Sequence, residues 1–180
     1  NVFSSIDFVN SLKHIEKMEE LEPFLEENKK KFKGRELSGS TLGVVGLGDI
    51  GSKVAGMGVA LDMKVIGYDP ALSVEAAWRL PSQVEPADSI EEIFSRGDFI
   101  TLHIPAIEST KGIVNLELLK NAKKASLLNF ARHEVVNTES ILEALETGLL
   151  INFITDFPTP DLIQRANDHG DVILLPHIGA

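Results

Sequence analysis

The 180-residue sequence contains no cysteine, one tryptophan and one tyrosine, and it has no apolar run long enough to span a bilayer. Without cysteine it forms no disulfides, thiolate nucleophiles or cysteine-based zinc sites, which suits a reducing cytoplasm, and we expect no metal site. Positive charge is also scarce, because 17 Lys and Arg stand against 27 Asp and Glu, a formal net charge of −10. Since an acidic surface gains nothing from phosphate backbones or anionic lipids, we expect neither nucleic acid nor a membrane as partner.

What is present is a regular alternation of short apolar runs with amphipathic stretches. The runs are continuous rather than alternating, which is typical of strands buried on both faces of a sheet. Strand and helix alternate every 20 to 30 residues or so, which predicts parallel strands joined by right-handed crossovers. We therefore expect a doubly wound α/β domain of the Rossmann type over residues 41–180, with strands at residues 41–45, 64–68, 99–104, 125–130, 150–157 and 172–175.

Two of the amphipathic stretches carry helix boundary signals. Asp88 and Glu91 have the spacing of a capping box, and Gly97 stands where that helix is expected to end. Asn137 is the expected N-cap of a later helix that stops at Gly148.

The first 40 residues follow a different pattern. Apolar residues fall at helical spacing from Phe8 to Leu21, and a mixed-charge run follows over residues 26–33. We expect a long amphipathic helix and a polar arm, which either closes one side of the sheet as a surface helix or serves as a dimerisation arm.

A glycine-rich motif lies between the first strand and the following helix pattern. Gly46, Gly48 and Gly51 have G-x-G-x-x-G spacing, which alone can be no more than a tight turn. In this context the first glycine permits the turn, the second lets the backbone approach a pyrophosphate, and the third lets helix and strand pack. The helix N-terminus adds partial positive charge, so the loop predicts dinucleotide binding.

The end of the second predicted strand indicates which dinucleotide is bound. Asp69 stands there, eighteen residues after Gly51. A carboxylate at this place accepts hydrogen bonds from the adenosine ribose and repels a 2′-phosphate, which favours NAD over NADP.

Six motifs occur in the order and spacing of the D-2-hydroxyacid dehydrogenases, and the chain resembles this family over essentially its whole length. The motifs are Gly46 to Gly51, Gly67 to Pro70, Leu102 to Pro105, Leu128 to Arg132, Asp156 to Pro158 and Pro176 to Gly179. The resemblance implies an NAD-dependent oxidoreductase that transfers a hydride between a small 2-hydroxyacid and NAD, and a homodimer formed through the nucleotide domain. It also implies a separate substrate domain, which we expect to be absent from this chain, leaving the chain alone with little or no turnover.

The resemblance further assigns site residues. His177 matches the family's acid/base histidine, and Arg132 matches the ligand of the substrate carboxylate; the plainer interpretations are a turn imidazole and a surface arginine. Asp156 matches the residue that hydrogen-bonds the nicotinamide amide. The full set of expected cofactor contacts is Gly46, Gly48, Asp49, Ile50, Gly51, Asp69, His103, Ile104, Pro105, Phe130, Ala131, Arg132, Asp156, His177 and Gly179.

The family's histidine is paired with a glutamate, and counting five residues from Asp156 reaches Asp161. We expect Asp161 to fix the tautomer of His177 as the third catalytic residue, although it also suits a helix N-cap.

Several positions depart from the family pattern. Asp49 suits the helix dipole but repels a nearby pyrophosphate, which predicts weaker NAD affinity. His133 replaces the glycine that usually follows the arginine and can reshape the substrate pocket, while His14 and His169 are expected to be solvated. Which 2-hydroxyacid is the substrate stays open, and so does the alternative of a non-catalytic module that senses NAD(H).

Overall fold

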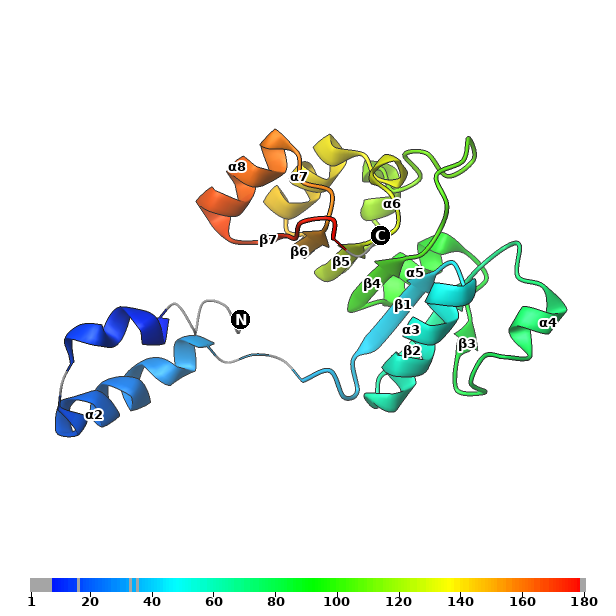
Figure 1. The fold of residues 1–180 in the computed structure, drawn as a ribbon. Helices are drawn as coiled ribbons and strands as arrows, with labels where there is room; N and C mark the ends of the chain where they lie inside the picture. The colour runs from blue at the N-terminus through cyan, green and yellow to red at the C-terminus, as the bar shows by residue number, and fades with distance from the viewer. Residues whose placement is uncertain (1–7, 16, 33, 35, 179–180) are drawn as a thin grey trace. The chain divides into compact units, whose positions relative to one another are not determined.

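The computed structural model describes residues 8–15, 17–32, 34 and 36–178, and it divides the chain into two units, residues 1–36 and residues 37–180 (Figure 1). The second unit begins earlier than the predicted boundary at residue 41. Ser38 Oγ donates to Asp62 Oδ2 at 2.7 Å, and Gly39 N–H donates to the carbonyl of Asp62 at 2.8 Å. These hydrogen bonds tie residues 38 and 39 to the turn that precedes the second strand.

The first unit is a helical arm rather than one long helix. The backbone is extended at Ile15 and Lys17, so a short 3₁₀ helix, η1 (Leu12–His14), is separated from α2 (Met18–Asn28). The break lets Phe8 stack on Phe24, with ring centroids 6.0 Å apart, and lie 4.8 Å from the ring of Phe32. The predicted polar arm is also helical, as the end of α2 and as η2 (Lys29–Phe32). Packing among the aromatic rings therefore determines the fold of this unit more than the helical spacing of its apolar residues does.

The second unit is a doubly wound α/β domain, which confirms the predicted fold. Seven parallel strands follow the order β3-β2-β1-β4-β5-β6-β7. They are β1 (Thr41–Val45), β2 (Lys64–Tyr68), β3 (Glu85–Pro86), β4 (Phe99–Leu102), β5 (Ala125–Asn129), β6 (Leu150–Thr155) and β7 (Val172–Leu174). Strand β3 was not predicted, and β4 to β7 end one or two residues earlier than predicted because the chain turns into loops at the carboxyl edge of the sheet.

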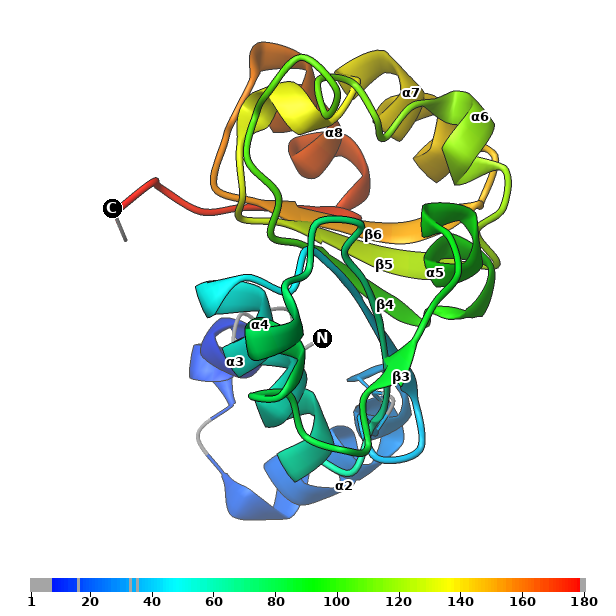
Figure 2. The same ribbon diagram turned by 90° about the vertical axis from the view of Figure 1, so that its right-hand side faces the viewer.

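The helices form two layers around the sheet (Figure 2). One face carries α3 (Asp49–Ala60) and α4 (Val74–Ala77), and the other carries α5 (Ile90–Arg96), α6 (Leu116–Leu119), α7 (Thr138–Glu146) and α8 (Pro160–His169). A short 3₁₀ turn, η3 (His133–Val135), precedes α7. The order of strands reverses direction between β1 and β4, and the crevice at such a point is where open parallel sheets bind ligands.

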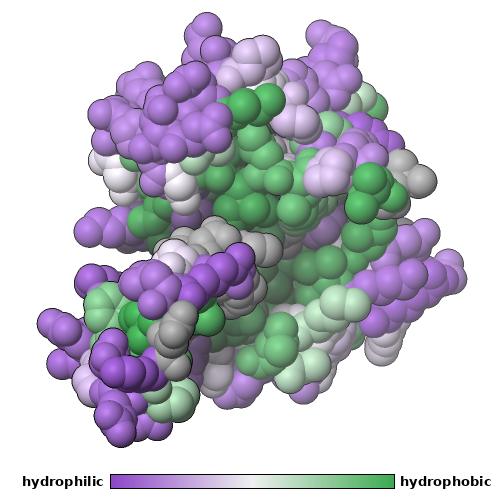
Figure 3. All heavy atoms as spheres, turned by 60° about the vertical axis from the view of Figure 1, so that its left-hand side comes forward, coloured by the Kyte–Doolittle hydropathy of each residue, from purple (hydrophilic) through white to green (hydrophobic). Residues whose placement is uncertain are grey.

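Burial on both faces explains the continuous apolar runs. On β1, Leu42 and Val44 belong to a cluster with Ala55 of α3, whereas Val45 belongs to the larger cluster that contains Ile93 of α5. Each side of the strand therefore meets its own helix layer. Hydrophobic residues also reach the surface, as Figure 3 shows for one face of the molecule.

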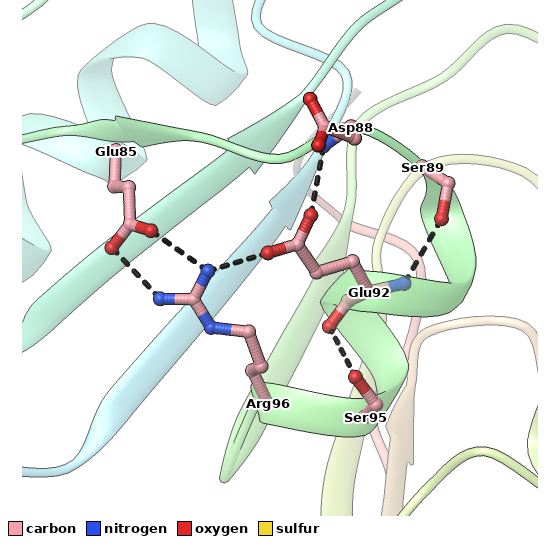
Figure 4. A network of polar contacts seen from close by, with 6 residues as sticks. All are labelled: Glu85, Asp88, Ser89, Glu92, Ser95 and Arg96. Atoms are coloured by element: carbon pink, nitrogen blue, oxygen red, sulfur yellow. Dashed lines mark hydrogen bonds and ion pairs between the residues drawn. The ribbon is translucent and has the colours of Figure 1, made fainter.

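The start of α5 differs from the predicted capping box by one residue. Ser89, not Asp88, is the N-cap, and its hydroxyl accepts from Glu92 N–H at 3.2 Å. Glu92 Oε2 accepts in turn from the N–H of Asp88, the residue before the N-cap, at 2.8 Å, so the return bond comes from Glu92 rather than Glu91 and reaches one residue beyond that of a standard capping box (Figure 4). The signals at Gly97, which is the C-cap of α5, and at Asn137, which caps α7, are confirmed.

An ion-pair network joins α5 to β3 (Figure 4). Arg96 binds both carboxylate oxygens of Glu85, at 2.8 and 2.7 Å, and also Glu92 at 2.6 Å. The guanidinium lowers the pKa of Glu85, while the Asp88 N–H and then Arg96 lower the pKa of Glu92. This network fixes the short edge strand β3 next to the end of β2.

Candidate functional site

The glycine loop follows β1 and is held by close backbone contacts. Gly46 has a φ of +90°, and its N–H donates to the carbonyl of Tyr68 at 2.8 Å. A Cβ on Gly46 would lie 2.5 Å from the carbonyl oxygen of His103, and a Cβ on Gly51 would lie 1.9 Å from the carbonyl oxygen of Gly46. Only glycine fits at these two positions, because a side chain on Gly46 would collide with the backbone of His103 and a side chain on Gly51 would collide with the backbone of Gly46.

The middle glycine is different, since a Cβ on Gly48 would meet no atom within 4 Å. Gly48 is the N-cap of α3 and offers no side-chain oxygen to the first N–H groups of that helix. These groups carry partial positive charge and are suited to an anion such as a pyrophosphate. The open space at Gly48 thus fits the predicted approach of a dinucleotide backbone.

Two predicted residues of the first helical turn are exposed. Asp49 and Ile50 both lie on the solvent side of α3, and Ile50 is 67% exposed. The carboxylate of Asp49 makes no hydrogen bond or ion pair with the described part of the chain. It is therefore available to act on whatever charge approaches the N-terminus of α3.

Asp69 lies at the carboxyl end of β2 and is bonded to the glycine loop. Its Oδ2 accepts from Leu47 N–H and its Oδ1 accepts from Ala71 N–H, both at 2.9 Å. Each carboxylate oxygen has capacity for a second donor, so the carboxylate can still accept from ribose hydroxyls. Asp69 also lines a hollow of about 600 Å³ whose walls include Leu72, Leu80 and Val84.

A second, smaller hollow of about 190 Å³ brings three predicted segments together. It is lined by the first turn of α3, the loop after β4 and the loop after β5: Ile50, His103, Ile104, Pro105, Phe130, Ala131 and Arg132. The sequence motifs that contribute these residues lie up to 82 positions apart, and the parallel sheet places them at one edge.

The loop after β5 depends on a buried amide that the sequence interpretation missed. Asn129 is fully buried; its Nδ2 donates to the carbonyl of Arg132 at 2.9 Å and its Oδ1 accepts from Ala131 N–H at 3.2 Å. Thr155 of β6 donates to the carbonyl of Asn129 at 2.9 Å. The available signal was a polar residue that ends an otherwise apolar strand. These bonds fix the turn that presents Phe130 and Arg132.

The two residues expected to handle the substrate are both exposed. Arg132 Nη1 donates to the carbonyl of its neighbour Ala131 at 2.7 Å. His177 follows β7 and meets the ring of Phe157 edge-on, with ring centroids 4.9 Å apart. Neither side chain is engaged by a carboxylate of the described chain, so both can reorient toward a ligand.

Asp156 follows β6 and carries an unusual atom. Its Oδ1 is buried and has no hydrogen-bond partner in the described chain. A buried acceptor without a donor is costly, so an incoming donor group would be stabilised by this oxygen. An N–H donor such as the nicotinamide amide would satisfy this oxygen, which fits the role expected for Asp156.

The structure does not bring Asp161 together with His177. Asp161 is exposed in the first turn of α8 and lines a hollow shared with α7, together with Glu143 and Glu146. No hydrogen bond or ion pair among the described residues joins it to His177. It is not the N-cap either, because Thr159 caps α8 by accepting from Leu162 N–H at 3.4 Å. The segment Thr159–Pro160 starts a helix that carries Asp161 toward α7.

The remaining histidines and expected positions are placed as follows. His103 is half-buried, and burial lowers its pKa; His14 and His169 are exposed, as predicted, and so is His133 in η3. The predicted contact at Gly179 lies outside the described residues. The part of the chain that the structure describes holds no cluster of three metal-binding side chains and no helix long and apolar enough to cross a bilayer.

Comparison with known proteins defines the class. Residues 6–179 match the family model described as the NAD binding domain of D-isomer specific 2-hydroxyacid dehydrogenases. The chain therefore belongs to this family, and the predicted cofactor NAD is confirmed.

Individual relatives are more specific. The chain is 40% identical over 158 residues to D-3-phosphoglycerate dehydrogenase of Rattus norvegicus, a match that covers 85% of this chain and 29% of the rat protein. It is 37% identical to hydroxypyruvate reductase of Thermotoga maritima, covering 84% of this chain and 50% of that protein. The NAD-complexed D-isomer specific 2-hydroxyacid dehydrogenase of Lactobacillus delbrueckii ssp. bulgaricus is similar in structure, with a TM-score of 0.69 at 29% identity over 82% of this chain and 48% of that one. The chain thus spans between 29% and 50% of the length of these relatives.

Proposed function

We propose that this chain is the NAD-binding part of a D-3-phosphoglycerate dehydrogenase, which oxidises 3-phosphoglycerate to 3-phosphohydroxypyruvate at the start of serine biosynthesis. The relatives that carry this name support the choice of substrate. The hydroxypyruvate reductase among the relatives supports the competing choice of a smaller, unphosphorylated 2-hydroxyacid.

One observation carries the proposal. The hollow of about 190 Å³ joins Ile50 at the N-terminus of α3, where the pyrophosphate is expected, to Arg132, the expected ligand of the substrate carboxylate. A dinucleotide whose phosphates lie at α3 would thereby place its reactive ring next to the arginine. Hydride transfer requires this proximity of cofactor and substrate.

Different residues of the domain would bind different parts of the cofactor. The N–H groups at the start of α3 would bind the pyrophosphate, Asp69 the adenosine ribose, and the buried Oδ1 of Asp156 the carboxamide. The carboxylate of Asp69 would exclude a 2′-phosphate by charge repulsion. Bound NAD supplies the hydride acceptor for the reaction.

The chemical roles fall to two exposed side chains. Arg132 would bind the substrate carboxylate through its forked guanidinium, which must first leave the carbonyl of Ala131. His177 would take the proton of the hydroxyl group as the hydride departs, and return it in the reverse reaction. The ring of Phe157 lies beside the imidazole, with ring centroids 4.9 Å apart.

We also propose that the protein is a homodimer formed through this chain. The arm leaves apolar side chains exposed, with Val9 57% and Met18 62% accessible. A second copy of this chain, bound at the arm, would cover these side chains. Light scattering after size exclusion should give the mass of a dimer, and a monomer at micromolar concentration would contradict this part.

The substrate is tested by following NADH oxidation by the full-length protein with 3-phosphohydroxypyruvate, hydroxypyruvate and pyruvate. We expect the highest kcat/KM with 3-phosphohydroxypyruvate. A higher kcat/KM with hydroxypyruvate or pyruvate would contradict the proposed substrate but not the proposed class of reaction.

A second candidate is favoured by the position of Asp161. No hydrogen bond or ion pair joins His177 to a carboxylate of the described chain, which is compatible with a module that binds NAD(H) and does no chemistry. NADH binding without turnover of any of the three substrates would identify this alternative.

A further inference from the structure

The further inference concerns His103, whose ring makes one polar contact. Its Nε2 lies 3.0 Å from Oγ1 of Thr101, two residues earlier on β4. Thr101 is only 4% exposed, and its hydroxyl has no other hydrogen-bond partner in the described chain. One hydrogen therefore lies between Thr101 Oγ1 and His103 Nε2, and it belongs either to the hydroxyl group or to the ring.

The buried hydroxyl decides the tautomer of the ring. A threonine hydroxyl has one proton to donate, and buried donors are almost always satisfied. Nε2 of His103 is the acceptor within reach, so Thr101 donates to it. A neutral imidazole that accepts at Nε2 carries its own proton on Nδ1. Burial lowers the pKa of His103, which favours the neutral ring.

The other nitrogen is open to a ligand. Nδ1 has no hydrogen-bond partner in the described chain, and it is not among the buried unpaired atoms, so solvent reaches it. His103 lines the same hollow as Ile50 and Arg132. Its backbone and Cβ are pressed against the loop glycines, because a Cβ on Gly46 or Gly51 would approach them to 2.5 and 3.3 Å. The ring is thus fixed beside the path expected for the cofactor.

We propose that Thr101 holds His103 as a neutral Nδ1–H donor, and that this N–H binds an oxygen of the ribose or phosphate on the nicotinamide side of bound NAD. The inference rests on the proposed binding mode of the dinucleotide. A neutral donor suits this hollow because Arg132 already places a cation there. The site would gain a hydrogen bond without a second positive charge next to the substrate carboxylate.

The tautomer is tested without any ligand. Long-range ¹H–¹⁵N correlation spectra of the ¹⁵N-histidine-labelled chain should show His103 protonated at Nδ1, whereas the exposed His133 and His169 should show the Nε2–H form usual in water. Thr101→Val removes the donor while keeping the shape, and should convert His103 to the Nε2–H form; Thr101→Ser should restore it. An Nε2–H tautomer in the unaltered chain would overturn the inference.

The contact is tested by titration with NADH and with ADP. His103→Leu should weaken NADH binding by about three- to tenfold, the effect of one lost hydrogen bond, and should leave ADP affinity unchanged. His103→Asn places an N–H donor close to the position of Nδ1 and should keep NADH affinity within about twofold of the unaltered value. Equal NADH affinity in the leucine variant, or an equal loss for ADP, would contradict the contact. Failure of the unaltered chain to bind NADH would instead reject the proposed function along with it.

Discussion

The two sides of the expected cofactor site differ in how far the chain builds them by itself. On the adenosine side, Asp69 is bonded to Leu47 N–H and Ala71 N–H, and the glycine loop is clamped by backbone contacts to the loop after β4. On the nicotinamide side, Arg132 binds its own neighbour's carbonyl, His177 makes a T-shaped ring contact with Phe157, and Asp156 Oδ1 has no partner in the described chain.

This difference indicates which part of the NAD site is already ordered before the cofactor binds. Groups that are already hydrogen-bonded lose little freedom when a ligand arrives, whereas free side chains must be ordered by it. We infer that the adenosine side supplies most of the affinity and that the nicotinamide side supplies the chemistry. The following substitutions separate the two.

The largest effect is expected within the glycine loop. Gly51→Ala would place a methyl group 1.9 Å from the carbonyl oxygen of Gly46, so the loop must move. We expect the free energy of unfolding to fall by about 3 kcal/mol and NADH binding to be lost. Urea denaturation and NADH fluorescence titration measure the two quantities.

Gly48→Ala is the matched control for this change. Its Cβ meets no protein atom, so the loss of stability should stay below about 1 kcal/mol, the effect of changing an N-cap. The methyl group nevertheless fills space that we assign to the pyrophosphate, and NADH affinity should fall by about tenfold or more. A stable Gly48→Ala variant with unchanged affinity would remove the pyrophosphate from this place.

The same contrast explains what the sequence could predict. The glycine loop and Asp69 were predictable because each has a local sequence signal, the G-x-G-x-x-G spacing and a carboxylate at the end of a strand, although the contacts that hold them come from distant residues such as His103 and Leu47. The strands were predictable as continuous apolar runs, but their ends were not, since the turn at the carboxyl edge depends on contacts between loops. The reciprocal cap at Glu92 was missed by one residue because Ser89 and Asp88 are both good caps.

Residues that act through tertiary contacts escaped prediction. Asn129 and Thr101 are ordinary polar residues in the sequence, and they gain their roles only when β5 and β4 bury them. Asp161, five residues after Asp156, lies in the first turn of α8 and lines a hollow shared with α7, so its pairing with His177 stays a prediction. The position of a side chain at the start of a helix depends on the direction of that helix, which spacing does not encode.

The next largest effect is expected for the chemistry itself. In the full-length protein, His177→Asn should lower kcat by about 10²- to 10⁴-fold, the usual contribution of a general base. NADH affinity should stay within about twofold, because affinity comes mainly from the adenosine side. Steady-state kinetics and NADH titration measure the two.

Asp161→Asn provides the comparison on the same side. Since this carboxylate is exposed in the hollow shared with α7, we expect kcat to change by less than about threefold, within the range of surface substitutions. A loss close to that of the histidine variant would show that Asp161 reaches His177 during turnover.

An intermediate effect is expected for Asp69→Asn. An amide has one acceptor oxygen, so it loses one of the bonds to Leu47 N–H and Ala71 N–H as well as the charge. NADH affinity should fall by about tenfold or more, and the preference for NADH over NADPH should shrink. Asp62→Asn removes the same charge at the opposite end of β2 and should change neither affinity, as parallel titrations will show.

The smallest effect has the opposite sign and concerns Asp49. This exposed carboxylate stabilises the N-terminus of α3 but repels a pyrophosphate that approaches the same N–H groups. Asp49→Asn should therefore tighten NADH binding by about two- to threefold at low salt while slightly lowering the stability of the domain.

Salt distinguishes this effect from a change in shape. Screening weakens the repulsion in the unaltered chain, so its NADH affinity and that of the Asp49→Asn variant should converge as ionic strength rises. Glu139→Gln, which removes an acidic residue from the first turn of α7, controls for net charge and should leave NADH affinity unchanged. If the Asp49→Asn variant bound NADH more weakly at every salt concentration, Asp49 would be a ligand of the cofactor, and the start of α3 would have to hold the dinucleotide by its hydroxyl groups rather than by its phosphates.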